Sequence, residues 1–226
     1  MVTPDPSTAN EITHLTGAWV LLMSFALLYQ KRITGAIRIF MLQAMGVALT
    51  AAWQGFVQGS THLALTAALI LLFKGMAIPY LLHWAVARMN WRRESSDAPL
   101  GVGATLALGV GLVVLAILLT HPVTAASATF TRIHLALSLS ILFLGLLMMV
   151  SRDHAMFQVM GFLSLENGLS LAGVSVWGMP LVMEMGVALA VLVTVMVVGL
   201  LVLRLHQRFD RLDTGHLAPR RGENPP

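Results

Sequence analysis

Apolar residues occupy seven long stretches of this chain, and charged residues gather in the shorter segments between them. Each stretch approaches the roughly 20 residues that a helix needs to cross a hydrocarbon core about 30 Å thick. The pattern therefore predicts an all-α, polytopic membrane protein with seven transmembrane helices. We expect these helices at residues 14–30, 34–58, 61–88, 100–120, 130–150, 154–177 and 180–205.

Basic residues fall almost entirely on one side of this arrangement. That side carries Lys31, Arg32, Arg38, Arg88, Arg92, Arg93, Arg152, Arg204, Arg208, Arg211, Arg220 and Arg221. The other side keeps only Arg132. Because cytoplasmic loops of membrane proteins are rich in lysine and arginine, the amino terminus is expected outside and the carboxyl terminus in the cytoplasm. The sequence thus predicts a multi-pass protein of the inner (plasma) membrane.

Composition agrees with a membrane protein and excludes several kinds of site. Of 226 residues, 57% are hydrophobic and 11% charged, whereas about a quarter of a soluble domain is charged. The chain has no cysteine, which excludes disulfides, thiolate metal sites, iron–sulfur clusters and cysteine nucleophiles. Redox metals would therefore belong to other subunits. The net charge of +4 comes from residues at helix ends, so no nucleic-acid partner is expected.

The histidines and methionines do not predict a cofactor. Histidines such as His14 and His134 are expected near helix ends, so pairs are conceivable, but no pair sits at matched mid-depth as membrane haem would need. The 14 methionines are better suited to filling gaps between helices. We therefore expect no haem, no metal and no other cofactor in this chain, and no catalytic centre of its own.

The first three and the last three helices follow a similar plan, which indicates a possible duplicated three-helix unit. Matched positions are His14 with His134, Arg32 with Arg152, Arg88 with Arg204, Gln43 with Glu166 and Lys74 with Ala190. The expected organisation is an exposed amino-terminal tail (1–12), a first unit (13–93), a connecting loop and fourth helix (94–124), a second unit (125–206) and a cytoplasmic tail (207–226).

Glu166 is the candidate functional residue that the hydrophobic pattern makes most conspicuous. It lies about 14 residues from Arg152 and about 11 from Trp177, which is mid-membrane at ~1.5 Å per helical residue. A charge at that depth costs roughly 2.5–3.5 kcal/mol, so ionisable residues there usually serve a function. On the same helical face we expect the supporting polar residues Gln158 and Ser170. The alternative is a permanently protonated acid that only hydrogen-bonds a neighbouring helix.

Lys74 is expected at a similar depth in the third helix, too deep to reach either surface easily. Its own helical face is apolar, so its partner must come from another helix or subunit, and Glu166 is the obvious candidate. Pro79 removes the hydrogen bond to the carbonyl of Gly75 and should kink or loosen the helix one turn from the lysine. The alternative is a static buried ion pair that only fixes helix packing.

Glu184 follows Pro180 by four residues and is expected about one turn below the outer surface. It is either a solvated interfacial carboxylate or the outer mouth of a proton path that reaches Glu166.

Several segments resemble the hydrogenase-4 component E family. The residues that carry this resemblance are Gly161-Phe162-Leu163-Ser164-Leu165-Glu166-Asn167-Gly168 with Ser151-Arg152 and Gln158 before them, Lys74 with Pro79, Glu184-Met185-Gly186, and the tail Phe209–Thr214. The resemblance covers most of the chain. The last three helices are also similar to the K subunit of respiratory complex I and its counterpart in multisubunit cation/proton antiporters.

The resemblance implies an accessory membrane subunit of a complex I-like hydrogenase or formate hydrogenlyase. Its partners would be antiporter-like and other membrane subunits, and a peripheral arm with nickel–iron and iron–sulfur centres would supply the redox energy. Glu166 would be the midplane proton acceptor and Lys74 the companion basic site. Apart from the resemblance, we expect Gln43, which the possible repeat matches with Glu166, and Asn167 as supporting polar residues. Where the family usually has an acidic residue in the seventh helix, this chain has Ala190, which weakens a relay there.

Two other functions fit the same pattern. A subunit of a multisubunit cation/proton antiporter would have similar helices but no redox partner. A scaffolding membrane protein would keep Glu166 only for packing.

Overall fold

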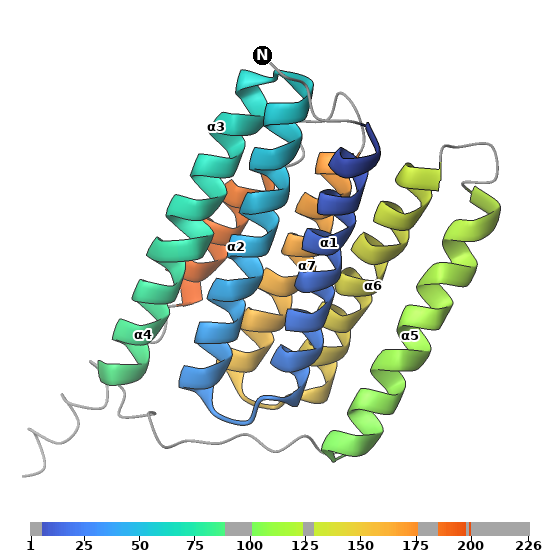
Figure 1. Cartoon of the computed structure of the whole chain (residues 1–226). Helices are drawn as coiled ribbons and strands as arrows, with labels where there is room; N and C mark the ends of the chain where they lie inside the picture. Colours follow the sequence, from blue (N-terminus) through green and yellow to red (C-terminus); the bar gives the residue numbers. More distant parts are fainter. Residues whose placement is uncertain (1–5, 89–100, 124–128, 176–184, 198, 200–226) are drawn as a thin grey trace, which may run out of the picture.

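The computed structural model describes residues 6–88, 101–123, 129–175, 185–197 and 199, and the secondary structure in these ranges is helical apart from a single bridge residue at Arg32. The helices run beside one another in a single bundle (Figure 1). They are α1 (Pro6–Tyr29), α2 (Ile33–Gln58), α3 (Thr61–Ile70), the π-helix η1 (Leu71–Ala77), α4 (Ile78–Arg88), α5 (Val102–Val123), α6 (Thr129–Ser151) and α7 (Ala155–Ser175). A further apolar helix covers Met185–Val197.

The all-α prediction is confirmed. Five helical stretches are long and apolar enough to cross a membrane, namely Asn10–Tyr29, Ile33–Gln58, Thr61–Arg88, Val102–Pro122 and Ile133–Ser151. Helix α7 is not among the five, and it carries the buried polar residues Ser164, Glu166, Asn167 and Ser170. Two points stay predictions: that all seven expected helices span the membrane, and that the last three helices are a duplicate of the first three.

Where the structure describes both ends of a predicted helix, the predicted boundaries hold within a few residues except at the amino terminus; the predicted end at 177 and the predicted ends at 180 and 205 lie outside the described residues. The described part of helix α1 begins at Pro6, inside the range predicted as an exposed tail. Proline is tolerated in a first helical turn, because its φ is fixed near the helical value and the N–H that it lacks would have no partner there. Residues 1–5 of that tail, the cytoplasmic tail 207–226, and the residues Trp177, Glu184, Arg92 and Arg204 lie outside the described ranges.

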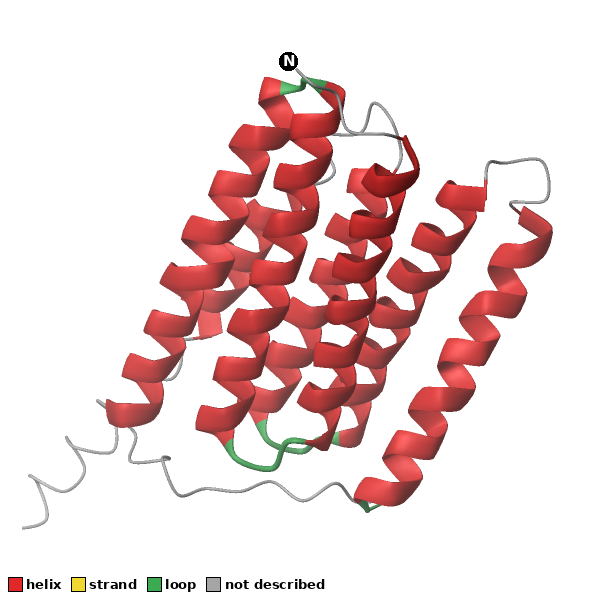
Figure 2. Cartoon of the chain, in the orientation of Figure 1, coloured by secondary structure: helices red, strands yellow, loops and turns green. Residues whose placement is uncertain are grey.

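Packing places α2 and α7 next to each other in the interior and α5 at one edge. Helix α7 contacts α6 and α2, and α2 also contacts α1, α3, η1 and α4. Helix α5 packs mainly on α6, with a smaller contact to α1. It stands at the side of the bundle in Figure 1. Short loops join α1 to α2 and α6 to α7 (Figure 2).

Close contact between helices depends on glycine at the α6–α7 interface. A Cβ atom on Gly168 would lie 2.9 Å from the backbone nitrogen of Leu142 and 2.9 Å from the carbonyl oxygen of Ser138. A Cβ on Gly145 would lie 2.6 Å from the backbone nitrogen of Leu165. Small residues allow such backbone approach in membrane helix pairs, so these glycines fix the position of α7 beside α6.

Two apolar clusters divide the bundle along its axis. We call the one nearer the top of Figure 1 the upper cluster, and it contains Val20, Val47, Ala48, Ala51, Ala67, Ile70, Ile141, Leu171, Val174 and Val187. The lower cluster contains Leu27, Leu28, Ile33, Ala36, Ile37, Phe40, Ile78, Leu82, Ala85, Val86, Leu144, Met148, Met156, Phe157, Val159, Met160, Leu163 and Ala190. Buried polar side chains lie between these clusters on several helices.

Candidate functional site

The helix that carries Lys74 is unwound into a π-helical turn at the lysine itself. Residues Leu71–Ala77 are π-helical, and the N–H of Ile78 bonds the carbonyl of Phe73, five residues earlier. Proline at position 79 cannot donate a backbone hydrogen bond, so the predicted loosening is present and takes the form of a π turn. Single π turns inside α-helices are frequent at functional sites.

Lys74 and Glu166 form an ion pair in the interior of the bundle. The lysine is 0% exposed and the glutamate 2%. Among the residues whose side chains are described, Arg152 is the other buried group with a permanent charge. The structure therefore gives Lys74 the partner that the sequence suggested, on a different helix and at the same depth.

Each of the three ammonium donors of Lys74 has an acceptor. Nζ contacts Glu166 Oε2 and donates hydrogen bonds of 3.1 Å to Asn167 Oδ1 and 3.1 Å to Ser170 Oγ. The hydroxyl of Ser170 in turn donates to Glu166 Oε1 at 2.9 Å. An ammonium group has three donors and no acceptor, so this arrangement satisfies a buried charge completely, as burial of an ion pair demands.

Hydrogen bonds continue from the ion pair across the bundle to α1. Asn167 Nδ2 donates to Gln43 Oε1 at 3.3 Å. Gln43 Nε2 donates to Ser24 Oγ at 2.7 Å and to Ser164 Oγ at 2.8 Å. We call the connected set the polar layer. It consists of Ser24, Gln43, Lys74, Ser164, Glu166, Asn167 and Ser170, all buried.

The Glu166-Asn167-Gly168 motif now has a physical explanation. Glu166 pairs with the lysine, Asn167 joins that pair to Gln43, and Gly168 lets α7 approach α6 closely. Three consecutive residues of a helix point about 100° apart, so they serve three different neighbours. The motif thus supplies the contacts through which α7 packs against η1, α2 and α6.

Not every predicted site residue belongs to this layer. Gln158 is exposed and donates from Nε2 to the carbonyl oxygen of Arg152 at 3.0 Å, about 12 Å along the helix from Glu166 at ~1.5 Å per residue. Glu184 lies outside the described residues. Ser24 and Ser164 were not predicted as site residues. In an apolar helix, a serine that bonds another helix has the same sequence pattern as a serine that bonds only its own helix.

Two further polar contacts lie away from the layer. Arg152, counted in the sequence as a topological charge, is buried and donates from Nη2 to the carbonyls of Leu28 (2.7 Å) and Gln30 (3.0 Å) at the end of α1. The rings of His14 and His134 stack with centroids 4.8 Å apart and planes 12° apart. Within the described ranges, no three histidine or acidic side chains come together as metal ligands.

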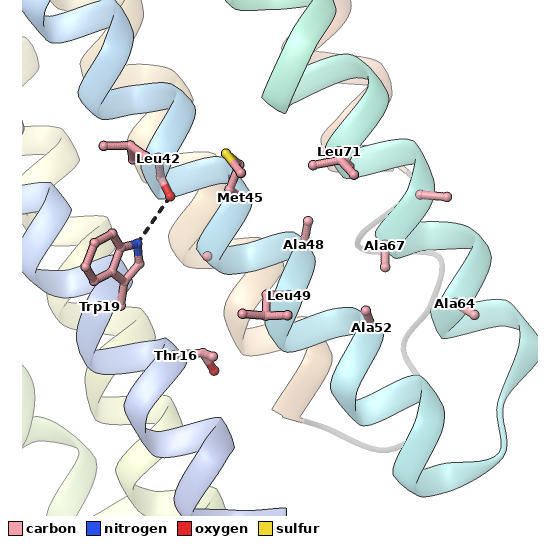
Figure 3. A pocket seen from close by; sticks show the side chains of 12 residues that line it. Thr16, Trp19, Leu42, Met45, Ala48, Leu49, Ala52, Ala64, Ala67 and Leu71 are labelled. Atoms are coloured by element: carbon pink, nitrogen blue, oxygen red, sulfur yellow. Dashed lines mark hydrogen bonds between the residues drawn. The ribbon is translucent and has the colours of Figure 1, made fainter.

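A groove of about 620 Å³ lies between α1, α2 and α3, away from the ion pair. Figure 3 shows that Leu42, Met45, Ala48 and Leu49 of α2 form its floor, and the Trp19 indole donates to the carbonyl of Leu42 at 3.3 Å. No ionisable side chain lines this groove. The groove suits an apolar occupant, such as lipid, rather than proton chemistry.

Comparison with known proteins agrees with a membrane subunit. Hydrogenase-4 component E of Escherichia coli is 28% identical over 150 residues, which is 66% of this chain and 69% of the relative, and the same protein of Shigella flexneri matches equally. An uncharacterized protein of Mycobacterium tuberculosis is 26% identical over 199 residues, 88% of this chain and 90% of the relative. No family model and no solved structure matches. The chain is therefore a distant homologue of hydrogenase-4 component E.

Proposed function

We propose that this chain is a membrane-embedded accessory subunit of a complex I-like hydrogenase, of the hydrogenase-4 or formate hydrogenlyase type. In it, Glu166 and Lys74 would couple redox chemistry in partner subunits to proton translocation. The observation that carries the proposal is the buried ion pair of these two residues, which hydrogen bonds connect to two other helices, α2 and α1. The distant homology to a hydrogenase component supports the assignment.

The geometry is suited to a change of charge state. In the ion-paired form, the positive and negative charges cancel within the polar layer. If Glu166 takes up a proton, Lys74 keeps a buried positive charge with only neutral acceptors at Asn167 and Ser170, which is unfavourable in a medium of low dielectric constant. A second charge change must then follow, either loss of a proton from the lysine or arrival of a negative charge nearby. The pair would thus respond to charge movement in an adjacent subunit.

The predicted assembly follows from this role. The partners would be antiporter-like and other membrane subunits, with nickel–iron and iron–sulfur centres in a peripheral arm, and the chain itself would bind no cofactor. We propose seven spans in the inner (plasma) membrane, with the amino terminus outside and the carboxyl terminus inside. The carboxyl-terminal half would be similar to the complex I K subunit. The rings of His14 and His134 stack on each other, and these residues hold matched positions in the predicted repeat. A pseudo-symmetry axis between α1 and α6 would bring matched residues together in this way, which supports a duplicated unit.

The test is proton translocation by membrane vesicles that contain the complex with this subunit as Glu166→Gln. Glutamine keeps the size of the side chain and can still accept a hydrogen bond from Lys74, but it cannot carry a proton. We expect substrate-driven proton translocation to be lost while the subunit still assembles. The matched control is Glu11→Gln, the same chemical change at an exposed position, which should pump as the wild type does.

The outcome separates coupling from scaffolding. If Glu166→Gln pumps normally in a fully assembled complex, the residue only packs helices and the coupling role fails. The chains that co-purify with this subunit in mild detergent distinguish a hydrogenase from a cation/proton antiporter. Nickel-binding and iron–sulfur subunits indicate a hydrogenase, whereas antiporter subunits without them indicate an antiporter.

A further inference from the structure

Two histidine rings lie face to face between α1 and α6, at the end of the bundle where both helices begin (the top of Figure 1). The ring centroids of His14 and His134 are 4.8 Å apart, and the ring planes differ by 12°. His134 is 0% exposed and His14 is half-buried. A Cβ atom on Gly17, one turn after His14, would lie 3.8 Å from two atoms of the His134 ring. The ring of His134 therefore lies between the imidazole of His14 and the backbone of α1.

This pair lies closer to the membrane surface than Glu166 does. His14 follows Asn10, where the apolar part of α1 begins, by four residues. His134 follows Thr129, the first residue of α6, by five. These separations are roughly 6 and 7.5 Å along the helix axes, about half the distance to the middle of a ~30 Å hydrocarbon core. Side chains of an α-helix lean toward its amino-terminal end, so both imidazoles lean toward the surface and present a polar edge to it.

Hydrogen bonds hold α1 at both of its ends. At the far end, Arg152, directly after α6, donates to the carbonyls of Leu28 and Gln30, and a guanidinium keeps its charge at every physiological pH. At the near end, Gln54 of α2 donates from Nε2 to Oγ1 of Thr13 at 3.1 Å. The stacked imidazoles join α1 to α6 at this near end, and imidazoles change their charge close to neutral pH. The near end of the α1–α6 contact is therefore sensitive to pH, whereas the far end is not.

Protonation changes the interaction between the two rings from attraction to repulsion. Neutral aromatic rings attract each other when they stack, but two positive charges about 4.8 Å apart repel, most strongly where burial lowers the local dielectric constant. Burial also removes the hydration of a charged ring. In an opened chain both rings are hydrated and take up protons below their ordinary pKa of about 6.5. The closed stack is thus favoured above that pH and becomes less stable as the pH falls below it.

The described groups around the pair do not cancel two positive charges. The titratable residues described at this end of the bundle are exposed, namely Glu11 of α1, His62 of α3 and His121 of α5. Helix α2 has Arg38 at its far end, and α7 has Glu166 near its middle. The side chain of Arg132 and the residue Glu184 lie outside the described part of the chain. The carboxylate on the exposed first turns of α1 is screened by water and can neutralise one ring at most.

We propose that the stack of His14 and His134 is a proton-binding site that opens the contact between α1 and α6 when the pH falls on the side where these helices begin. One proton is held by one ring, and a second proton brings two like charges together and separates the helices at this end. Arg152 keeps the far end of α1 in place, so the motion is a hinge opening. Helix α1 stays with α2 through Thr13 and Gln54. This inference does not rest on the proposed function.

Distances between spin labels on the full chain, reconstituted in lipid vesicles at equal pH on both sides, test the opening directly. The chain has no cysteine of its own, so the labels attach only at introduced cysteines. One pair, Leu15→Cys with Ile133→Cys, lies beside the stack. The other pair, Tyr29→Cys with Val150→Cys, lies at the end that Arg152 holds. All four positions are exposed, so the labels displace no buried side chain.

From about pH 8 to about pH 5, on either side of the ordinary imidazole pKa, the distance beside the stack should lengthen by on the order of 2–5 Å. The distance at the far end should stay constant. His14→Phe combined with His134→Phe keeps two stacked rings that take no proton, so both distances should then stay constant. The matched control is His121→Phe, which removes an exposed histidine at the same end and should behave as the wild type does.

Three results would overturn the proposal: a distance beside the stack that does not change with pH, an equal change in the double phenylalanine variant, or an equal change at the far end. Thermal unfolding gives a second readout. Between the same two pH values the unfolding midpoint of the wild type should fall by about 2–4 °C more than that of the double variant. Glu166 is present in both proteins, so its titration does not contribute to this difference. If the double variant fails to accumulate, the two distances in the chain with both histidines still decide.

Discussion

Asn167 hydrogen-bonds Lys74 through its oxygen and Gln43 through its nitrogen, at 3.1 and 3.3 Å. The amide therefore joins the ion pair of η1 and α7 to the amide on α2. A side chain with both a donor and an acceptor is required, because Lys74 can only donate and Gln43 presents its carbonyl oxygen here. The position explains why the residue after the acid is asparagine rather than a second carboxylate, which would add a buried negative charge.

Asn167→Leu should destabilise the protein by about 1–3 kcal/mol for each group left without a partner, the Lys74 donor and the Gln43 acceptor. Thermal unfolding of the purified protein in detergent measures the loss. Ser164→Ala is the control, because it leaves only one buried group without a partner, the second N–H of Gln43, and the loss should stay near 1–3 kcal/mol in total. Equal losses for the two variants would contradict the bridging role of Asn167.

Lys74→Met should destabilise the protein by about 3–5 kcal/mol, because it leaves the Glu166 carboxylate buried without a counter-charge. The double variant Lys74→Met with Glu166→Gln should regain at least about 1 kcal/mol relative to the sum of the single changes. Unfolding midpoints of the four proteins provide the cycle. Additive losses would mean that the two residues do not stabilise each other.

Gly168→Ala should cost about 1–3 kcal/mol, because overpacking would force α6 and α7 apart. The added Cβ would lie 2.9 Å from backbone atoms of α6. Gly111→Ala, on α5 with open space around the new atom, should be neutral or gain up to about 1 kcal/mol from its better helix propensity. Thermal unfolding compares the two, and a stabilising Gly168→Ala would show that α7 has room to move.

Arg152→Met should destabilise the protein by roughly 2–3 kcal/mol, because charge-assisted hydrogen bonds to two carbonyls at the end of α1 are lost. The guanidinium also lies 5.1 Å from the ring centre of Phe157. Arg38→Met is the control, since Arg38 is exposed and its loss should change the unfolding free energy by less than about 0.5 kcal/mol. Similar unfolding midpoints for the two variants would contradict the capping role of Arg152.

The ion pair could be predicted from the sequence because Lys74 and Glu166 have opposite charges and were expected at similar depth in separate apolar helices. Few other residues at that depth could neutralise either charge. It did not predict the route of hydrogen bonds to α1. Ser24 bonds its own helix as well as Gln43, so its second contact depends on how α1 and α2 pack. Pro79 predicted a disturbance one turn from the lysine, but only the packed helix shows that the disturbance is a π turn.

Helical periodicity wrongly placed Gln158 beside Glu166, and the count of basic residues did not indicate that the Arg152 side chain is buried. Gln158 points to the same side of α7 as Glu166, but it lies about two turns away along the helix axis. The angle between two side chains around a helix does not give their separation along its axis. Arg152 was expected with the other basic residues at the helix ends on one side of the bundle, but its side chain turns inward to the carbonyls of α1. An exposed arginine and a capping arginine have the same sequence pattern, so tertiary packing decides between them.

Infrared difference spectroscopy of the working complex tests most directly whether Glu166 exchanges a proton. If it does, turnover will produce a change in the C=O stretch of a protonated carboxyl, and this change will be missing in Glu166→Gln but present in Glu11→Gln. A spectrum without any carboxyl change during turnover, or with a change that survives Glu166→Gln, would show that the carboxylate of Glu166 keeps one charge state throughout.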